Sequence, residues 1–463
     1  MQASEPNIAS KLDVSARWPC VAFLVSGIFW LLIGSAFAFI SSYKLHSPEF
    51  LGSIPWLTFG RVRTAHLNSV IYGFSSMAGI GTLLWLVTRL SRAPLQGVGG
   101  LLISAILWNL GVTVGIYLIL TGRMQGLEWL EFPPPIWIIF GIAFLFVVWS
   151  SLRTFRLRAS QYTYVSQWYL FGATLWFPPL YMIANLPIYS GVPQAAMNWW
   201  YAHNVLGIWF TPIGLAAAYY FIPKIIGRPI YSYYLSLLGF WSLALFYNWN
   251  GSHHLVGGPI PAWLMTASIT ASVMMAIPVT TVAINHHMTT KGHFHMLRVS
   301  PTLRFVVFGA MSYTAVSLQG STQALRSVAR ITHFTQHTIA HSHMGMYAFF
   351  AMTLFGTIYY ILPRVTMVPW PSARAIRWHF WLTGIGIAIY VISLTTGGFI
   401  QGFALDNPKK PFIESVTALI PYFWMRTVAA VLMTLGHIIF AVSIYRVLRH
   451  FVTTYPSIKG KSA

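Results

Sequence analysis

The stretch QHTIAHSHMGMYAFF, residues 336–350, is otherwise apolar enough to span a membrane, yet it carries His337, His341 and His343. Across the 463-residue chain, 56% of the residues are hydrophobic and only 8% are charged. A soluble domain carries roughly a quarter charged residues, so the composition predicts a protein embedded in lipid. The three imidazoles need a reason to lie there, because ionisable groups inside membranes are costly and usually functional.

Apolar stretches long enough to cross a bilayer recur along the whole chain. A hydrocarbon core of about 30 Å takes about 20 apolar residues per helix, and most of the stretches end in Pro, Gly or basic clusters. The sequence predicts an all-α integral membrane protein with about twelve transmembrane helices. We expect one domain, residues 1–463, with a short polar segment at residues 1–17. The expected spans are 18–42, 60–88, 97–120, 134–152, 163–188, 196–222, 232–255, 261–286, 302–322, 334–362, 378–400 and 416–445.

The charges favour one orientation in the membrane. The chain has 28 Lys and Arg against 7 Asp and Glu, a net charge of +21. If the N-terminus is cytoplasmic, most of the basic residues fall on the cytoplasmic side, as the positive-inside rule requires. We therefore expect both termini in the cytoplasm and contacts between basic loops and anionic lipid of the bilayer. Since this accounts for the positive charge, nucleic acid is not expected as a partner.

Cysteine and the acidic residues exclude several classes of protein. The single cysteine, Cys20, rules out an internal disulfide and any two-cysteine copper or heme-attachment motif within the chain. None of the seven acids lies near the middle of an expected span, which disfavours a carboxylate-relay transporter. The histidines of the 286–295 segment are expected to be solvated.

Other histidines gather at one depth of the membrane. In the expected topology four spans place them roughly 10 Å or less below their outer ends, at 1.5 Å per residue. Scattered core histidines would have no reason to share a layer, and imidazole is the commonest metal ligand among side chains. The set consists of His66, His203, His253, His254, His341 and His343.

The spacings predict how these ligands divide. His341 and His343 are two residues apart, so their side chains point about 200° apart around a helix and bind different cofactors. The pair at 253–254, with His203, offers three nitrogens that suit copper or zinc. His66 then pairs with one of the two histidines at 341 and 343. The ligands divide as two for one heme, one for a second heme with an open face, and three for copper.

The segments around these histidines resemble a known family. They are FGRVRTAHLNSVIYGF around His66, WWYAHNVLGIWFTP around His203, YYFIPKIIGRPIYSYYLS, FYNWNGSHHL, and THFTQHTIAHSHMG around His341. They span roughly residues 55–365 and resemble subunit I of the heme-copper oxygen reductase superfamily. More narrowly, the chain is similar to the catalytic subunit of cbb3-type (C-type) cytochrome c oxidases. A tyrosine six residues before the double histidine, here Tyr247, is specific to that type.

The resemblance implies a cofactor for each histidine. His66 and His343 resemble the axial ligands of a low-spin heme b, and His341 resembles the ligand of a high-spin b-type heme. The copper ligands would be His203, His253 and His254. Tyr247 resembles the family's tyrosine that is covalently linked to the copper ligand equivalent to His203. Its phenol can supply an electron and a proton when the O–O bond breaks, so Tyr247 and His203 are the implied catalytic pair.

Further residues match the family's accessory positions. Four match its single proton path, with helix–helix hydrogen bonding as the alternative: Thr211, Tyr219, Ser236 and Tyr313. Four lie at the outer edge, where guanidinium groups would pair with heme propionates or else face headgroups: Arg61, Arg63, His333 and Arg426. Glu128 matches a glutamate near a calcium ion, and oxygen-rich loops suit calcium.

Two positions depart from the family pattern. Gln319 stands where the family has a glutamate near the active site, and an amide cannot exchange a proton as a carboxylate does. This departure bears on the proton route and on the substrate. His337 stands where the family has a tryptophan, and no ligand role is expected for it.

The resemblance implies a terminal oxidase of the bacterial cytoplasmic membrane that reduces dioxygen to water and is coupled to proton translocation. Because the chain lacks a heme-attachment motif, electrons would arrive from membrane-anchored c-type cytochrome subunits. One alternative is a nitric oxide reductase of the same superfamily, which generally replaces copper with non-heme iron and adds buried glutamates. The other alternative is a transporter or a non-catalytic membrane heme protein.

Overall fold

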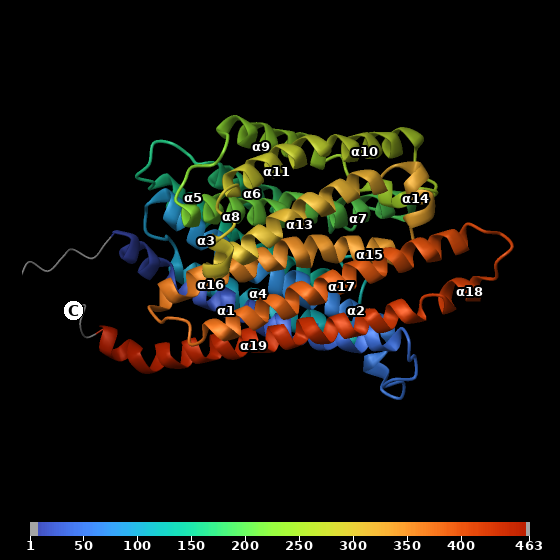
Figure 1. Ribbon diagram of the computed structural model, residues 1–463, viewed down its shortest axis with the longest axis horizontal. Helices are drawn as coiled ribbons and strands as arrows, with labels where there is room; N and C mark the ends of the chain where they lie inside the picture. The colour runs from blue at the N-terminus through green and yellow to red at the C-terminus, as the bar shows by residue number, and fades with distance from the viewer. Residues whose placement is uncertain (1–7, 460–463) are drawn as a thin grey trace, which may run out of the picture.

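The computed structural model describes residues 8–459, with side chains up to residue 454, and every regular element in that range is a helix (Figure 1). The α-helices are α1 (Ile8–Lys44), α2 (Phe59–Asn68), α3 (Ser76–Ser91), α4 (Val98–Leu120), α5 (Pro134–Arg156), α6 (Val165–Ala184), α7 (Gly191–Val205), α8 (Thr211–Ile226), α9 (Tyr233–Tyr247), α10 (Ala262–Met274), α11 (Ala276–Thr290), α12 (Met296–Val299), α13 (Pro301–Gln323), α14 (Arg326–Thr332), α15 (Gln336–His343), α16 (Met352–Thr366), α17 (Ala373–Leu405), α18 (Phe412–Thr417) and α19 (Ile420–Lys459). Short 3₁₀ turns cover Pro55–Leu57 and Ser252–Leu255.

The predicted all-α membrane architecture is confirmed. Each expected span overlaps a helix, and within the described range nine helices are long and apolar enough to cross a membrane. The three remaining expected spans form α6, α9 and α13, which are shorter or carry more polar residues. The chain is therefore a multi-pass membrane protein.

The first helix begins earlier than the sequence predicts. The polar segment 1–17 is expected to precede the first span, but α1 already begins at Ile8, and residues 1–7 lie outside the described part. Polar side chains of this first part are buried because the bundle offers them partners. Asp13 pairs with Arg89 at 3.2 Å, and Arg17 donates to the carbonyl of Val365 at 2.7 Å.

The expected span at 232–255 is wrong in its last third. The helix α9 ends at Tyr247, and the chain then turns through Gly251, whose φ of +113° favours glycine. A Cβ at Gly251 would also lie only 2.6 Å from the carbonyl oxygen of Trp199. The double histidine is consequently on the 3₁₀ turn that follows, not on the helix.

The helices run along one long axis and form a single bundle in Figure 1. The helices α9 and α10 form one edge of this view, and α17 and α19 pack together at the opposite edge. The start of α1 and the end of α19 lie at the same end of the bundle, as the predicted topology requires.

The most buried spans are the ones that carry the histidines. In the most apolar window of each helical run, 94% of residues are buried in Phe59–Ser91, 83% in Gly191–Ile226 and 78% in Gln336–Thr366. The other spans of this kind reach at most 50%. His66, His203 and the 341/343 pair therefore lie on the helices that are farthest from lipid.

Each of these three buried runs contains a π-helical segment just after its histidine. Ser69–Ser75 begins three residues after His66, Leu206–Phe210 three residues after His203, and Met344–Ala351 directly after His343. The π geometry inserts an extra residue into a turn and is frequent at functional sites. The extra residue rotates the helical turn that carries the histidine relative to the part of the helix that follows.

Candidate metal and heme centre

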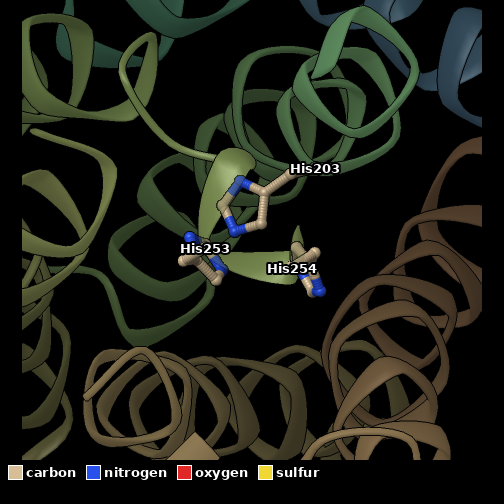
Figure 2. A group of neighbouring side chains, drawn as sticks. All are labelled: His203, His253 and His254. Atoms are coloured by element: carbon tan, nitrogen blue, oxygen red, sulfur yellow. The ribbon is translucent and has the colours of Figure 1, made fainter. Parts of the chain in front are cut away.

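Three histidines from two separate segments meet inside the bundle. His203 lies on α7, and His253 and His254 lie on the 3₁₀ turn after α9. One ring nitrogen from each lies within 4.8 Å of the others, and Figure 2 shows the three side chains gathered in one place. Such a set of three imidazole nitrogens fits a copper or zinc ion.

The ring of His253 is oriented by hydroxyl groups of α10. Its Nδ1 lies 3.0 Å from the hydroxyl of Ser272 and 3.3 Å from that of Ser268. The backbone N–H of His253 also donates to Ser268 at 3.1 Å. Hydrogen bonds to one ring nitrogen set the direction of the other, which is how metal-binding histidines are commonly held.

The structure brings Tyr247 beside His203, as the predicted catalytic pair requires. The two rings are stacked with their centroids 5.0 Å apart. Gly207, one turn after His203, makes this approach possible, because a Cβ there would overlap the tyrosine ring.

His341 faces the same space from the other side of the bundle. A cavity of about 140 Å³ is lined by the three-histidine group, Tyr247 and His341. The Nδ1 of His341 lies 3.2 Å from Oε1 of Gln319, which leaves Nε2 for the cavity. Gly320 allows this placement, since a Cβ there would lie 3.0 Å from the His341 ring.

His66 and His343 form a second pair in a separate cavity of about 310 Å³. Their rings are nearly parallel, at 11°, with centroids 6.3 Å apart. Two metal–nitrogen bonds of roughly 2 Å each, plus about 1 Å from each nitrogen to its ring centre, come to about 6 Å. The spacing therefore fits two axial ligands on one iron, as in a bis-histidine heme.

Backbone carbonyls orient both rings of this pair. Nδ1 of His66 lies 2.9 Å from the carbonyl of Gly34, and Nδ1 of His343 lies 2.9 Å from that of Ile339. In each case Nδ1–H donates, so Nε2 is the nitrogen left for a metal. The hydroxyl of Tyr390 lies 3.3 Å from Nε2 of His343, a long hydrogen bond that a metal would replace.

The four residues expected at heme propionates separate into three groups. Arg63 and Arg426 line the cavity of His66 and His343. His333 instead lines the cavity of the three-histidine group. Arg61 lines neither cavity and donates to the carbonyls of Pro55 at 2.8 Å and Leu120 at 3.2 Å.

Both glutamates of the loop between α4 and α5 have side-chain partners, so neither is a free carboxylate. Glu128 pairs with Arg63 at 2.8 Å, and Glu131 is buried and accepts a hydrogen bond from Asn68 at 3.1 Å. Burial, together with the neighbouring Glu128, raises the pKa of Glu131 to about 7. The pairing with Arg63 leaves the Glu128 carboxylate less available to calcium.

The residues expected on a proton path lie on α8, α9 and α13. Thr211 and Tyr313 line the cavity of the three-histidine group, while Ser236 is buried and donates to the carbonyl of Tyr233. The Tyr219 hydroxyl is buried farther along α8, 3.4 Å from the Asn285 amide.

His286 is a residue for which the sequence-based expectation is wrong. The sequence predicts a solvated side chain, but His286 lies on α11 with only 3% of its surface exposed, and its ring is 4.4 Å from that of Tyr219. Neither ring nitrogen has a hydrogen-bond partner among the described residues. Because the segment after 286 is polar and basic, periodicity alone gives no signal that α11 continues inside the bundle.

Known proteins give an independent comparison. The family model "Cytochrome C and Quinol oxidase polypeptide I" matches residues 19–432. A cytochrome c oxidase subunit 1 homolog of Azorhizobium caulinodans is 31% identical, with 90% of this chain and 79% of the relative covered. The cbb3-type cytochrome c oxidase subunit CcoN1 of Stutzerimonas stutzeri is 29% identical, with 92% and 94% covered.

More distant similarities agree on the fold. A nitric oxide reductase chain of Stutzerimonas stutzeri is 25% identical, with only 51% of this chain and 52% of that protein covered. A solved heme-copper terminal oxidase dimer superposes with a TM-score of 0.67 at 16% identity, over 96% of this chain and 84% of that one. The extent of the family match, together with the relatives that cover nearly the whole chain, shows that this protein belongs to the cytochrome c and quinol oxidase polypeptide I family and is a subunit I of the heme-copper oxidases.

Proposed function

We propose that the chain is the catalytic subunit of a cbb3-type terminal oxidase that reduces dioxygen to water. The observation that carries the proposal is one cavity lined by His203, His253, His254, Tyr247 and His341. The first three would hold copper and His341 would hold a high-spin b-type heme. When bound, this heme–copper pair supplies the redox chemistry of dioxygen reduction.

The second cavity supports an electron-transfer role for a low-spin heme b between His66 and His343. Their parallel rings, 6.3 Å apart, would hold the heme from both sides and leave no room for substrate, so this heme would supply electron transfer. Arg63 and Arg426 line the same cavity and would pair with the propionate groups. Membrane-anchored c-type cytochrome subunits would supply the electrons, as the resemblance of the sequence to cbb3-type oxidases implies.

Tyr247 is the residue that we assign to proton and electron supply at the cavity. Its ring is held against His203 by the close approach that Gly207 permits. A covalent bond between the two side chains, as in the family, would fix the phenol at this place. The phenol can then give a proton to oxygen as the O–O bond breaks, with protons replaced from the cytoplasmic side.

That replacement is assigned to Thr211, Tyr219, Ser236 and Tyr313. Two of them line the cavity, where no Asp or Glu is among the described lining residues, and the other two are buried on α8 and α9. The proposed orientation has both termini in the bacterial cytoplasm, so this path would begin at the cytoplasmic face. Coupling to proton translocation follows from taking these protons from one side of the membrane.

The absence of carboxylates near the histidines favours the oxidase over a nitric oxide reductase. No Asp or Glu is among the described residues that line the cavity of the three-histidine group. Non-heme iron prefers sites that include a carboxylate, whereas three imidazoles suit copper. The match to nitric oxide reductase also covers only about half of the chain.

The purified complex with its partner subunits provides the test. Oxygen and nitric oxide consumption are measured with a reduced c-type cytochrome, and copper, iron and heme are quantified in the same preparation. We expect oxygen consumption well above nitric oxide consumption, with two b-type hemes and one copper per chain. A preparation with non-heme iron in place of copper, or one that consumes only nitric oxide, contradicts the proposal.

A further inference from the structure

Two glutamines of α13 and two histidines of α15 contact one another through their polar side-chain atoms beside the cavity. Gln319 and Gln323 are one helical turn apart, and so are His337 and His341. Gln319 contacts both histidines: its Oε1 lies 3.2 Å from Nδ1 of His341, and its Nε2 lies 3.4 Å from Nε2 of His337. The amide of Gln323 contacts Nδ1 of His337.

The numbers of donors and acceptors determine which side chain donates in each of these hydrogen bonds. If Nε2 of His341 binds a metal, Nδ1 carries the hydrogen and donates it to Oε1 of Gln319. The Gln319 NH₂ group then donates to Nε2 of His337, so Nδ1 of His337 carries the second hydrogen. The Gln323 atom placed at this nitrogen is Nε2, which is also a donor. We therefore assign the Gln323 amide the orientation turned by 180°, in which its oxygen accepts the hydrogen from Nδ1 of His337.

In this hydrogen-bonded series all four side chains are uncharged. The surroundings of His337 favour the uncharged imidazole. His337 is 3% exposed, and none of the seven acids of the chain is among its contacts. Its ring packs edge-on against Phe399 of α17 with centroids 4.8 Å apart. The helix α17 approaches so closely that a Cβ at Gly398 would overlap the backbone of His337. A charged imidazole without an anionic partner is costly at such a place.

We propose that Gln319 is a positioning residue that sets the reduction potential of the high-spin heme through His341, an inference that rests on the proposed function. The hydrogen-bond partner of a metal-bound imidazole controls its basicity, and hydrogen bonding behind the ligand is one means by which proteins tune heme potential. A neutral amide accepts more weakly than a carboxylate, so His341 keeps the character of a neutral imidazole. His337 and Gln323 fix the amide orientation and prevent its oxygen from turning away.

This assignment predicts an ordered series at position 319. A leucine removes the acceptor, the wild-type amide is a weak one, and a glutamate is a strong one. The midpoint potential of the high-spin heme is expected to fall in the order Gln319→Leu, wild type, Gln319→Glu. The iron–histidine stretching frequency in the ferrous enzyme is expected to rise in the same order, because a stronger acceptor strengthens the bond from His341.

The experiment uses the purified complex and two readouts that do not depend on turnover. Midpoint potentials come from a spectroelectrochemical titration, and the iron–histidine frequency comes from resonance Raman spectra. The frequency separates hydrogen bonding from simple charge, because a charge that acts only through space moves the potential and leaves the bond unchanged. Thr322→Val is the matched control, since Thr322 is on the same helix, exposed, and bonded only to carbonyls of that helix.

If the high-spin heme has the wild-type potential and the wild-type iron–histidine frequency in both Gln319 variants, this inference is overturned and the proposed function is not affected. A wild-type complex without a five-coordinate ferrous heme overturns the proposed function and this inference with it. If the glutamate variant does not assemble, the leucine variant decides by itself. A higher potential with a lower frequency than in wild type and in Thr322→Val supports the inference, and unchanged values contradict it.

Discussion

At the scale of single residues, the chemistry depends on which ring nitrogen of each histidine is held by a hydrogen bond. Backbone carbonyls hold Nδ1 of His66 and of His343, and hydroxyls of α10 hold Nδ1 of His253. In each case the opposite nitrogen faces a cavity. The bonds that orient these rings are therefore as much a part of the proposed site as the rings themselves.

Replacing Tyr247 by phenylalanine tests the proton-supplying role. The ring and its packing against His203 remain, but the hydroxyl is lost, and groups that transfer a proton in the rate-determining step contribute about 100-fold or more. We expect oxygen consumption to fall at least about 100-fold while heme and copper contents stay at wild-type levels. Tyr234→Phe, on the same helix and 85% exposed, is the control. Activity within a few-fold of wild type would argue against the role.

The buried carboxyl of Glu131 predicts that the stability of the loop between α4 and α5 depends on pH. Its pKa is raised by burial from 4.5 to about 7, so between these values the folded protein holds a proton that the unfolded chain has released. Stability therefore falls as the pH rises through this window and is unaffected by this group below it. Thermal inactivation midpoints measured from pH 4 to 8 should decline in wild type and decline less in Glu131→Gln. Parallel curves for the two proteins would show that Glu131 does not titrate in this window.

At the scale of the elements, the site depends on local departures from α-helical geometry. The π-helical segments follow His66, His203 and His343 on the three most buried helical runs. The turn through Gly251 brings the double histidine back toward α7. A regular α-helix through any of these places would direct the histidine side chain differently.

Gly207→Ala tests the approach of α9 to the π-helical segment after His203. The new Cβ would overlap the ring of Tyr247, which must move, and a displacement of about 1 Å near a reacting group can cost on the order of 100-fold in rate. We expect a large loss of oxygen consumption, with the change largest in turnover number. In Gly99→Ala the Cβ meets nothing within 4 Å, so that variant should retain wild-type activity. Equal activities of the two variants would contradict the prediction.

At the scale of the whole molecule, burial and charge divide the bundle into functional regions. The three helical runs that carry His66, His203 and the pair at 341 and 343 are the most buried of the runs able to cross a membrane. The ion pair of Arg63 with Glu128 joins α2 to the loop between α4 and α5, which is on the outer side in the proposed orientation. Electrons would therefore enter from the outer side and protons from the inner side.

Site-directed labelling tests this orientation. Cys20 is fully buried, so a maleimide is expected to react only with the introduced cysteine. Met124→Cys is in the loop between α4 and α5, and Tyr162→Cys is in the loop between α5 and α6. A membrane-impermeant maleimide should label Met124→Cys in spheroplasts and Tyr162→Cys only in inside-out vesicles. The reverse pattern would invert the proposed topology and the direction of proton uptake.

The membrane class, the approximate spans and the six histidines that line the two cavities were predictable from the order of residues alone. These follow from the lengths of apolar runs and from 1.5 Å of rise per residue, which are local properties. The opposite directions of His341 and His343 also follow from their spacing, and the structure places them in different cavities.

The partners that each side chain contacts became known from the packing of the helices. That Arg61 bonds to loop carbonyls while Arg63 lines a cavity, and that His286 is buried against Tyr219, depends on how helices distant in sequence pack. The contacts of Gln319 with His337 and His341 need α13 and α15 in one register. The physical reason is that hydrogen bonds between helices depend on distances of a few tenths of an ångström, which periodicity along one chain does not contain.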